Sequence, residues 1–371
     1  MVGLPLHLKL ENLQITGAFK ERGALNRLLT MTDDERSRGV ITASAGNHGQ
    51  GVAYHASRLG IRAQVCMPVY ASMTKVAAVT RMGAEVIQVG SNFDECAEEA
   101  TRRTIEERLT YLPPFDDEDV IAGQGTIGLE LLEQVPDLEA VVVPVGGGGL
   151  ISGVGCAIKS LKPSVKVIGV ETARLPSMLV ALKEHRPVLL PTGSSIADGI
   201  AVRKAGVLTL ALCEKYVDEI VLVEEEEIAT AILRLLEIEK TVAEGAGAAA
   251  IAALLENRTH LSNQKTVAIL SGGNIDVMMV SHIIERGLVK DGRLLRVRVT
   301  LPDYPGGLAK LAAIIGAENA NIVQATHDRT YFGVSLGDAT IDLTMETRGP
   351  EHVVRLLARL AREGYPIERV Q

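Results

Sequence analysis

The chain has 371 residues, with 38 Lys and Arg against 46 Asp and Glu and a formal net charge of −8. This length suits two or three domains with sizeable cores. The acidic balance, without a basic stripe, argues against nucleic acid or an acidic membrane surface as the main partner. With four Phe, seven Tyr and no Trp, the cores must consist of aliphatic side chains, which is typical of buried parallel sheets.

The cysteines and the N-terminus indicate the compartment. Cys66, Cys96, Cys156 and Cys213 are far apart and form no closely spaced metal-binding pattern, so we expect buried free thiols in a reducing compartment. The first nine residues lack the apolar region and cleavage site of a signal peptide. The uncharged run 140–158 is interrupted by a proline and four glycines, so it is a poor membrane span. The sequence predicts a cytoplasmic protein.

Short apolar strands alternate with helices over most of the chain. Strands are expected at residues 39–43, 61–67, 84–89, 140–145 and 165–170, with helices at 49–59, 72–82, 92–108 and 151–161. This alternation predicts an α/β fold with mostly parallel sheets covered on both faces. Ligands of such sheets bind beyond the carboxyl ends of the strands, where this chain carries two glycine-bearing loops, at 44–51 and 146–149.

The pattern changes near residue 290. Strands are expected at 294–301, from 321, at 339–347 and at 367–370, with helices at 307–317 and 350–363. This βαββαβ order is the ferredoxin-like plan of an α+β domain. The charged stretch 285–293, which contains two glycines, is where we expect the boundary between this domain and the preceding one.

Lys20, in the segment TGAFKERGA at residues 16–24, is the most informative residue. A lysine becomes a catalyst when it forms an imine with a carbonyl, and the commonest carbonyl cofactor is pyridoxal phosphate. Such a site also needs a cradle for the phosphate. The four glycines 146–149 lie between an apolar strand and a helix, so their backbone N–H groups and the helix N-terminus could hold a phosphate dianion.

With the loop SAGNHGQG at 44–51 and the motif SGGN at 271–274, these segments resemble the threonine/serine dehydratases. These are a branch of the tryptophan-synthase-β-like, fold type II pyridoxal phosphate enzymes. The resemblance implies a catalytic domain over residues 1–286, with parallel sheets in two subdomains and the smaller one, at about 38–130, inserted in the larger. The motif DYPGGL at 303–308 resembles the amino-acid-sensing ACT module, which implies a regulatory domain over 294–371.

The resemblance also assigns roles to residues. Lys20 would be the catalytic residue, as Schiff-base lysine and general base, Asn47 would bind the ring hydroxyl of the cofactor, and Ser271 would meet its pyridine nitrogen. The cofactor-binding residues would be Lys20, Phe19, Asn47, Gly146, Gly147, Gly148, Gly149, Leu150 and Ser271. The substrate carboxylate would be bound by Ser44, Ala45, Gly46, Asn47 and His48.

Several of these residues have a second explanation. Asn47 could act as a helix N-cap, and so could Glu244, which otherwise resembles a glutamate near the cofactor ring. His48 is equally explained as a structural histidine. Glu171 is a weak candidate for a cation ligand. Relatives that bind a cation carry an aspartate six residues later, where this chain has Ser177, so no metal site is expected.

The implied activity is elimination from L-threonine to 2-oxobutanoate, and from L-serine to pyruvate, each with release of ammonia. A homo-oligomer, dimer or tetramer, and an amino-acid effector at the C-terminal domain are also implied. The alternatives are a serine racemase, which would carry a serine at the position of Ala45, and a dehydratase of another β-hydroxy amino acid such as 3-hydroxyaspartate. A non-catalytic amino-acid sensor is disfavoured by intact Lys20, Asn47 and Ser271.

Overall fold

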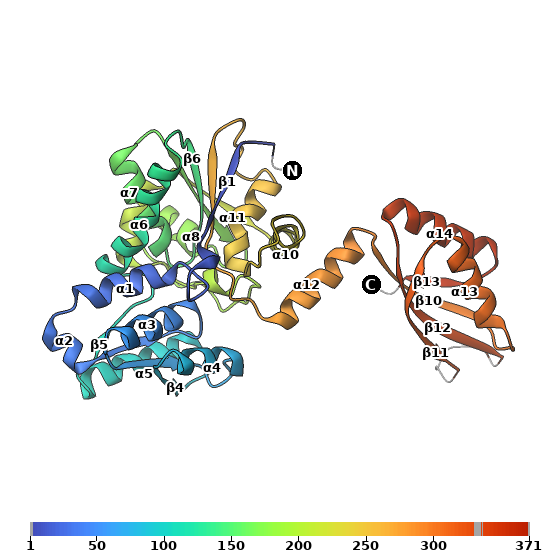
Figure 1. The fold of residues 1–371 in the computed structure, drawn as a ribbon, viewed down its shortest axis with the longest axis horizontal. Coiled ribbons are helices and arrows are strands. Elements are labelled where there is room, and N and C mark those ends of the chain that lie inside the picture. Colours follow the sequence, from blue (N-terminus) through green and yellow to red (C-terminus); the bar gives the residue numbers. More distant parts are fainter. Residues whose placement is uncertain (1–2, 330–334, 336, 370–371) are drawn as a thin grey trace. The chain divides into compact units, whose positions relative to one another are not determined.

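The computed structural model of this chain describes residues 3–329, 335 and 337–369. These residues form two compact units that divide between Ile275 and Asp276 (Figure 1). The sequence placed the end of the catalytic domain at residue 286. The helix α12 (Val277–Lys290) instead belongs to the second unit, because it packs on the first strand of that unit.

The larger sheet of the first unit is parallel and has the strand order β1-β9-β6-β7-β8. Its strands are β1 (Leu6–Leu10), β6 (Ala140–Pro144), β7 (Lys166–Thr172), β8 (Glu219–Val223) and β9 (Thr266–Leu270). Strands β6 and β9 read AVVVP and TVAIL and are buried throughout, as expected where helices cover both faces of a sheet. The first strand of the chain thus pairs with the last strand of the unit.

The smaller sheet is also parallel, with the order β4-β3-β2-β5. Its strands are β2 (Val40–Ala43), β3 (Ala63–Met67), β4 (Glu85–Gln88) and β5 (Thr110–Tyr111). Alternate strand residues enter two different cores. One core includes α3 (Asn47–Arg58) and α4 (Met73–Arg81), and the other includes α5 (Phe93–Glu106). The prediction of parallel sheets covered on both faces is therefore confirmed.

The remaining helices of the first unit cover these sheets and connect them. They are η1 (Glu11–Leu13), α1 (Lys20–Thr30), α2 (Asp33–Arg38), α6 (Glu118–Gln134), α7 (Gly149–Leu161), α8 (Ser177–Glu184), η2 (Asp198–Ile200), α9 (Val207–Tyr216), α10 (Glu225–Arg234), η3 (Leu235–Glu239) and α11 (Gly245–Leu255). Within the described part of the chain, no helix combines the length and the apolar character needed to cross a membrane.

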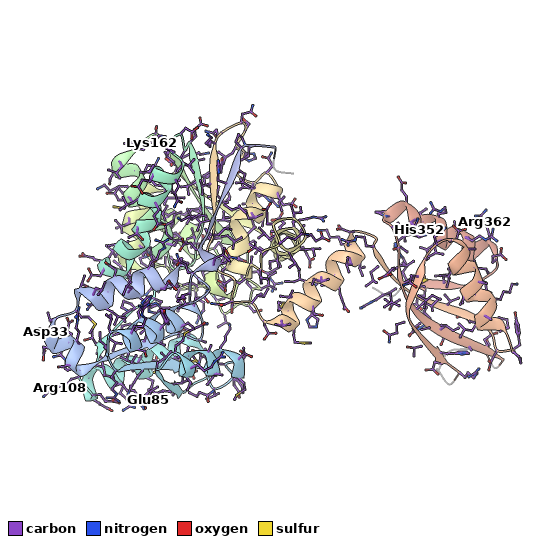
Figure 2. All side chains as sticks on the ribbon, viewed as in Figure 1. Asp33, Glu85, Arg108, Lys162, His352 and Arg362 are labelled. Carbon is purple, nitrogen blue, oxygen red and sulfur yellow. The ribbon has the colours of Figure 1, made fainter. Side chains whose placement is uncertain are left out.

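The second unit has an antiparallel sheet of order β11-β12-β10-β13 with its own apolar core. Its elements are β10 (Leu294–Pro302), α13 (Gly307–Ala317), β11 (Asn321–Asp328), β12 (Asp338–Glu346), α14 (Pro350–Arg362) and β13 (Ile367–Arg369). The predicted βαββαβ order is confirmed, although Val370, expected in the last strand, lies outside the described residues. His352, which Figure 2 labels on α14, accepts a hydrogen bond from the N–H of Arg348 at 3.0 Å.

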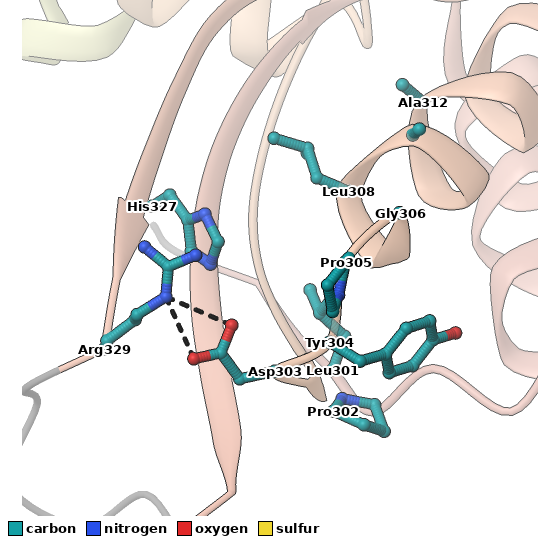
Figure 3. A pocket seen from close by; sticks show the side chains of 11 residues that line it. Leu301, Pro302, Asp303, Tyr304, Pro305, Gly306, Leu308, Ala312, His327 and Arg329 are labelled. Atoms are coloured by element: carbon teal, nitrogen blue, oxygen red, sulfur yellow. Dashed lines mark hydrogen bonds and ion pairs between the residues drawn. The ribbon is translucent and has the colours of Figure 1, made fainter.

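A cavity of about 720 Å³ lies beside the loop between β10 and α13. Figure 3 shows that Asp303 and Arg329 face each other across its polar part, where the Arg329 Nε lies 2.9 Å from a carboxylate oxygen of Asp303. Leu308 and Ala312 line it from α13. The cavity therefore combines an ion pair with an apolar wall.

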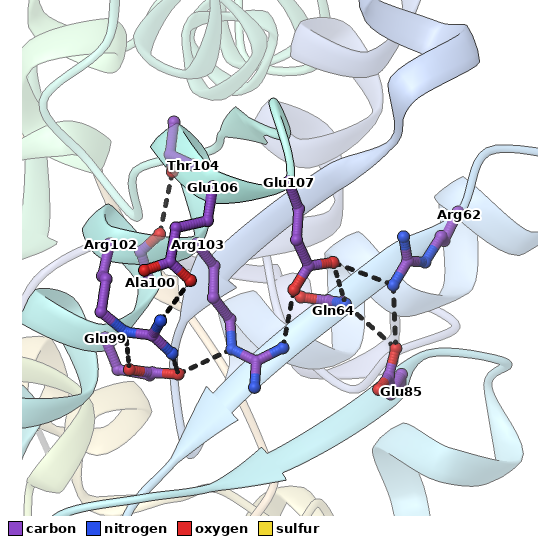
Figure 4. Close-up of polar contacts among 10 residues, drawn as sticks. All are labelled: Arg62, Gln64, Glu85, Glu99, Ala100, Arg102, Arg103, Thr104, Glu106 and Glu107. Atoms are coloured by element: carbon purple, nitrogen blue, oxygen red, sulfur yellow. Dashed lines mark hydrogen bonds and ion pairs between the residues drawn. The ribbon is translucent and has the colours of Figure 1, made fainter.

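The charges on α5 form a network at the surface (Figure 4). Arg103 bonds Glu99 on the same helix and Glu107, the residue just after its end, and Glu107 also accepts a hydrogen bond from Gln64 on β3 at 3.0 Å. Exposed pairs of this kind each contribute only about 0.2–1 kcal/mol. The network orients α5 on its sheet and adds little to the free energy of unfolding.

A second network, around Arg22, is buried and joins the first helix to two other segments. The Arg22 guanidinium bonds both oxygens of Glu11, each at 2.8 Å, and both oxygens of Glu130, at 2.6 and 2.8 Å. Glu11 is only 1% exposed, so its charge depends on this partner. Lys9 on β1 also reaches Glu130, at 2.6 Å. The start of α1, which carries Lys20, is thereby held against β1 and α6.

We expect Arg22→Met to lower the free energy of unfolding by roughly 3–5 kcal/mol, because the Glu11 carboxylate would stay buried without a partner. Urea unfolding measures this loss. The control is Lys166→Met, which breaks a partly exposed pair with Glu219 and should cost less than about 1 kcal/mol. Similar losses in the two variants would contradict a special role for the Arg22 network.

Candidate active site

Lys20 is the first residue of α1, and its side chain is partly buried within the first unit. Its Nζ donates a hydrogen bond to the carbonyl oxygen of Pro114 at 2.6 Å and lies 5.2 Å from the centre of the Phe19 ring. Burial lowers the pKa of Lys20 from 10.5 to about 8, against the opposing effect of the Glu244 carboxylate. A neutral amine, the nucleophilic form, is therefore accessible near neutral pH.

The chain just before Lys20 runs against the SGGN motif. The N–H of Phe19 donates to the carbonyl oxygen of Ser271 at 3.0 Å, and the N–H of Gly273 donates to that of Gly17 at 2.9 Å. Ser271 follows β9 directly and is 2% exposed. Two motifs some 250 residues apart are thus adjacent, as the functional hypothesis requires.

Asn47, Glu244 and Asn274 form a partly buried hydrogen-bonded chain beside them. The Asn47 amide donates to Glu244 at 2.7 Å and accepts from the Asn274 amide at 2.9 Å. Gly46, and not Asn47, is the N-cap of α3, so the capping explanation is wrong for Asn47. Glu244 does occupy the N-cap position of α11, but its side chain makes no capping hydrogen bond.

The charge state of Glu244 is unusual. Burial, followed by the nearby carboxylate of Asp198, raises its pKa from 4.5 to about 7. The hydrogen bond from Asn47 and the cation of Lys75, which bonds Asp198 at 2.8 Å, act in the opposite direction. Glu244 therefore exchanges its proton near neutral pH, in contact with the residue expected at the cofactor ring.

The loop between β2 and α3 contains the predicted substrate-binding residues. Ser44 accepts a hydrogen bond from the N–H of Gly46 at 3.3 Å, and Ala45 lies between them. His48 is 2% exposed, with Nε2 3.0 Å from the carbonyl oxygen of Leu112. Burial, and then the positive charge of Lys20, lower its pKa to about 3. His48 is thus a neutral histidine that donates to Leu112, and its Nδ1 has no partner among the described residues.

The glycine loop 146–149 connects β6 to α7, as predicted. Among the hydrogen bonds of the described residues, none uses the backbone N–H groups of residues 146–150 as donors. A Cβ atom at Gly147 would lie 2.4 Å from the Phe115 ring, and Gly148 has φ +97°. Unpaired donors at the N-terminus of a 13-residue helix, in a loop that admits no side chains, fit a phosphate group.

Glu171 has another use. Both of its oxygens accept backbone N–H groups at the start of α8, from Met178 and from Leu179, each at 2.8 Å. Burial raises its pKa to about 8, and Ser177 stands where a second carboxylate would be needed. Across the described ranges no group of three or more His, Cys, Asp or Glu residues could hold a metal ion. The weak cation candidate is better explained as a helix cap.

Sequence reasoning missed the segment between β5 and α6, residues 112–117. It supplies the carbonyl oxygens that bond His48 and Lys20, and Phe115 contacts the glycine loop. One signal was available, because Phe115 is one of only four phenylalanines in the chain and Phe19 is another. In a protein poor in aromatic residues, such a ring after two prolines merits attention.

Comparison with known proteins identifies the family. A family model described as a pyridoxal-phosphate dependent enzyme matches residues 1–272. The chain is 49% identical over 370 residues to an L-threonine ammonia-lyase from Thermotoga maritima, covering 100% of this chain and 92% of that protein. This chain belongs to the pyridoxal-phosphate-dependent threonine ammonia-lyase family.

Solved structures agree with this assignment. Threonine deaminase isoform 2 from Solanum lycopersicum matches with a TM-score of 0.74 and 40% identity, over 76% of this chain and 83% of that one. Maize serine racemase matches with a TM-score of 0.72 and 34% identity, over 78% and 89%. The predicted fold class and cofactor are confirmed, whereas the roles of individual residues remain predictions.

Replacing Glu244 with Gln should alter the pH dependence of stability. The folded-state pKa of about 7 lies above 4.5, so the wild type has its full stability below pH 4.5 and loses it as the pH rises through 7. Glutamine does not titrate. The free energy of unfolding of Glu244→Gln, relative to that of the wild type, should therefore rise by roughly 3 kcal/mol between pH 4.5 and pH 8, at about 1.4 kcal/mol per pKa unit.

Urea unfolding of the cofactor-free protein at the two pH values measures this gain. The control is Glu118→Gln, at the exposed first residue of α6, which should change the difference by less than about 0.5 kcal/mol. A constant difference between Glu244→Gln and the wild type would show that Glu244 does not titrate as a buried carboxyl group.

Proposed function

We propose that this chain converts L-threonine to 2-oxobutanoate and ammonia, and L-serine to pyruvate and ammonia. The relative from Thermotoga maritima, an L-threonine ammonia-lyase similar over the whole chain, supports the first reaction. The observation that carries the proposal is the position of Lys20, directly after the segment that bonds the SGGN motif, with its partly buried amine on the carbonyl oxygen of Pro114 and its pKa lowered to about 8. A partly neutral lysine at this place is suited to remove a proton from a substrate carbon.

Pyridoxal phosphate, when bound, supplies the electron-withdrawing group that makes the α-proton of an attached amino acid acidic. Lys20 would take that proton at Nζ. The α-proton and the β-hydroxyl would together leave as one molecule of water, so the proton taken by Lys20 balances the one that departs with the hydroxyl. Hydrolysis of the enamine product would give the 2-oxo acid and ammonia. The lysine needs no second basic group, because burial alone brings its pKa close to neutral.

The other motifs would bind and orient the reacting molecules. The N–H groups of residues 146–150 would hold the phosphate, and the Ser271 hydroxyl would meet the pyridine nitrogen. Asn47, oriented by Glu244 and Asn274, would bind the ring hydroxyl. Since a neutral hydroxyl does not keep the ring nitrogen protonated as a carboxylate would, Ser271 favours prompt loss of the β-substituent over transamination. The residues 44–48 would bind the substrate carboxylate at the N-terminus of α3.

Serine racemisation is the second candidate, favoured by the similarity to maize serine racemase. Racemisation requires a proton donor on the face opposite the lysine. By resemblance this donor would occupy the position of Ala45, and a methyl group carries no exchangeable proton. We therefore expect elimination to exceed racemisation. Elimination from another β-hydroxy amino acid, such as 3-hydroxyaspartate, would use the same residues.

Lys20→Ala should abolish release of ammonia from threonine and serine, because the proposed base is lost while the fold has its core elsewhere. Coupled assays of ammonia and 2-oxo acid, with a parallel assay of D-serine, measure both candidate reactions. The control is Lys183→Ala, an exposed lysine on α8, which should keep wild-type turnover. Retained turnover in Lys20→Ala would refute the assignment, and D-serine formation as fast as elimination would favour the racemase.

We also propose that an amino acid binds in the cavity of the second unit and regulates the enzyme. Asp303 and Arg329 would bind its ammonium and carboxylate groups, and Leu308 would contact its side chain. An effector changes activity only if it binds two states differently. Edge strands such as β11 could pair with a second copy in a homo-oligomer, dimer or tetramer, which would link binding to assembly.

Arg329→Gln should erase the response of threonine elimination to valine or isoleucine, while activity without effector stays at the wild-type level. The reason is that Arg329 belongs to the second unit, whereas every cofactor candidate belongs to the first. Isothermal titration of both full-length proteins with each amino acid gives the binding constants. A matched control is Arg355→Gln on α14, an exposed arginine that does not line the cavity. An unchanged response in Arg329→Gln would place the effector elsewhere.

A further inference from the structure

The segment 112–117, between β5 and α6, contacts several parts of the candidate site at once. The carbonyl oxygen of Leu112 bonds His48, and that of Pro114 bonds Lys20. The Asp116 carboxylate accepts the first three N–H groups of α9, at 3.0 to 3.1 Å. The residues on either side of Phe115 are therefore both held by hydrogen bonds, Pro114 by Lys20 and Asp116 by α9. These bonds fix the position of Phe115.

Phe115 lies directly against the glycine loop. A Cβ atom built on Gly147 would be 2.4 to 2.5 Å from three atoms of the Phe115 ring, and one on Gly149 would be 2.9 Å from the Phe115 Cβ. Real Cβ atoms do not approach other atoms so closely. Glycine at these two positions is therefore required by the approach of Phe115, whether or not a ligand is bound.

Gly147 is also held from a second direction. The hydroxyl of Thr209 on α9 donates to the carbonyl oxygen of Gly147 at 2.6 Å. Asp116 holds the N-terminus of α9, and Thr209 of α9 in turn holds the carbonyl of Gly147. Phe115, next to Asp116, packs against the Cα of the same glycine. We call this closed set of contacts the clamp. The N–H groups of the loop are left without acceptors in the described chain.

This clamp matters because glycine-rich segments lose more conformational entropy on ordering than any other sequence, about 1–2 kcal/mol per residue for the backbone. A loop ordered before the ligand arrives does not lose that entropy on binding, so affinity rises. We propose that Phe115 is a positioning residue for the cofactor phosphate, which holds residues 146–149 in their anion-binding conformation. The inference rests on the proposed assignment of this loop to the phosphate.

The test compares two ligands that differ only in the phosphate. Cofactor-free protein is titrated with pyridoxal phosphate and with pyridoxal, following the visible absorbance of the bound ligand. Phe115→Ala should weaken binding of pyridoxal phosphate at least about tenfold and leave pyridoxal nearly unchanged, because only the phosphate uses the ordered loop. Phe115→Tyr keeps the ring and should restore the wild-type ratio. Phe93→Ala, which removes a half-exposed phenylalanine at the start of α5, is the matched control.

A double substitution tests the contact itself. Gly147→Ala alone places a methyl group in the Phe115 ring and should weaken binding of pyridoxal phosphate. In the Phe115→Ala background the same methyl group has room, so its additional effect should largely disappear. Independent effects of the two substitutions would show that the ring does not act through Gly147.

The outcomes separate this inference from the proposed site. If wild-type protein binds pyridoxal as tightly as pyridoxal phosphate, residues 146–149 do not hold the phosphate and the site assignment is wrong. If the wild type prefers the phosphate and Phe115→Ala keeps that preference, only the role of Phe115 is overturned. Thermal unfolding of each cofactor-free variant checks folding, and Phe115→Leu replaces Phe115→Ala if the alanine variant does not fold.

Discussion

The site depends on one contact, the pairing of residues 17–19 with residues 271–273. Strands β1 and β9 are parallel neighbours, so the chain leaves both at the same edge of the sheet. There the two segments exchange backbone hydrogen bonds, from Phe19 to Ser271 and from Gly273 to Gly17. This contact sets the start of α1, and hence the backbone of Lys20, beside the SGGN motif.

Burial of ionisable groups gives the site its chemical character. Glu244 and His48 are buried and Lys20 is partly buried, and in each the loss of water shifts the pKa so as to favour the neutral form, to about 7, 3 and 8 respectively. Burying three such groups is unfavourable by itself. Hydrogen bonds to Pro114, Asn47 and Leu112 offset part of this cost. A region that lowers stability in this way is typical of a catalytic site.

The Arg22 network shows how the fold supports that arrangement. Lys20 begins a helix whose first turn is tied by the partly buried guanidinium of Arg22 to η1 and α6. The helix therefore cannot shift without separating buried charges, which is strongly unfavourable. The lysine amine can be weakly held, by one carbonyl oxygen, because its backbone is held firmly. A firmly held backbone keeps the Nζ of Lys20 within reach of a reacting atom, which is what precise positioning requires.

Local patterns in the sequence were enough to locate the strands, the glycine loop, Lys20 and the SGGN motif. Each of these depends on the residue types within a few positions: apolar runs for buried strands, glycines for a loop without room for side chains. The sequence could not decide whether Asn47 and Glu244 cap helices or contact each other, since their positions differ by 197 residues and either use suits the local backbone. Nor could it show Phe115 against Gly147. Such contacts arise only when the sheets and helices pack, and only the tertiary structure decides which polar and aromatic side chains then meet.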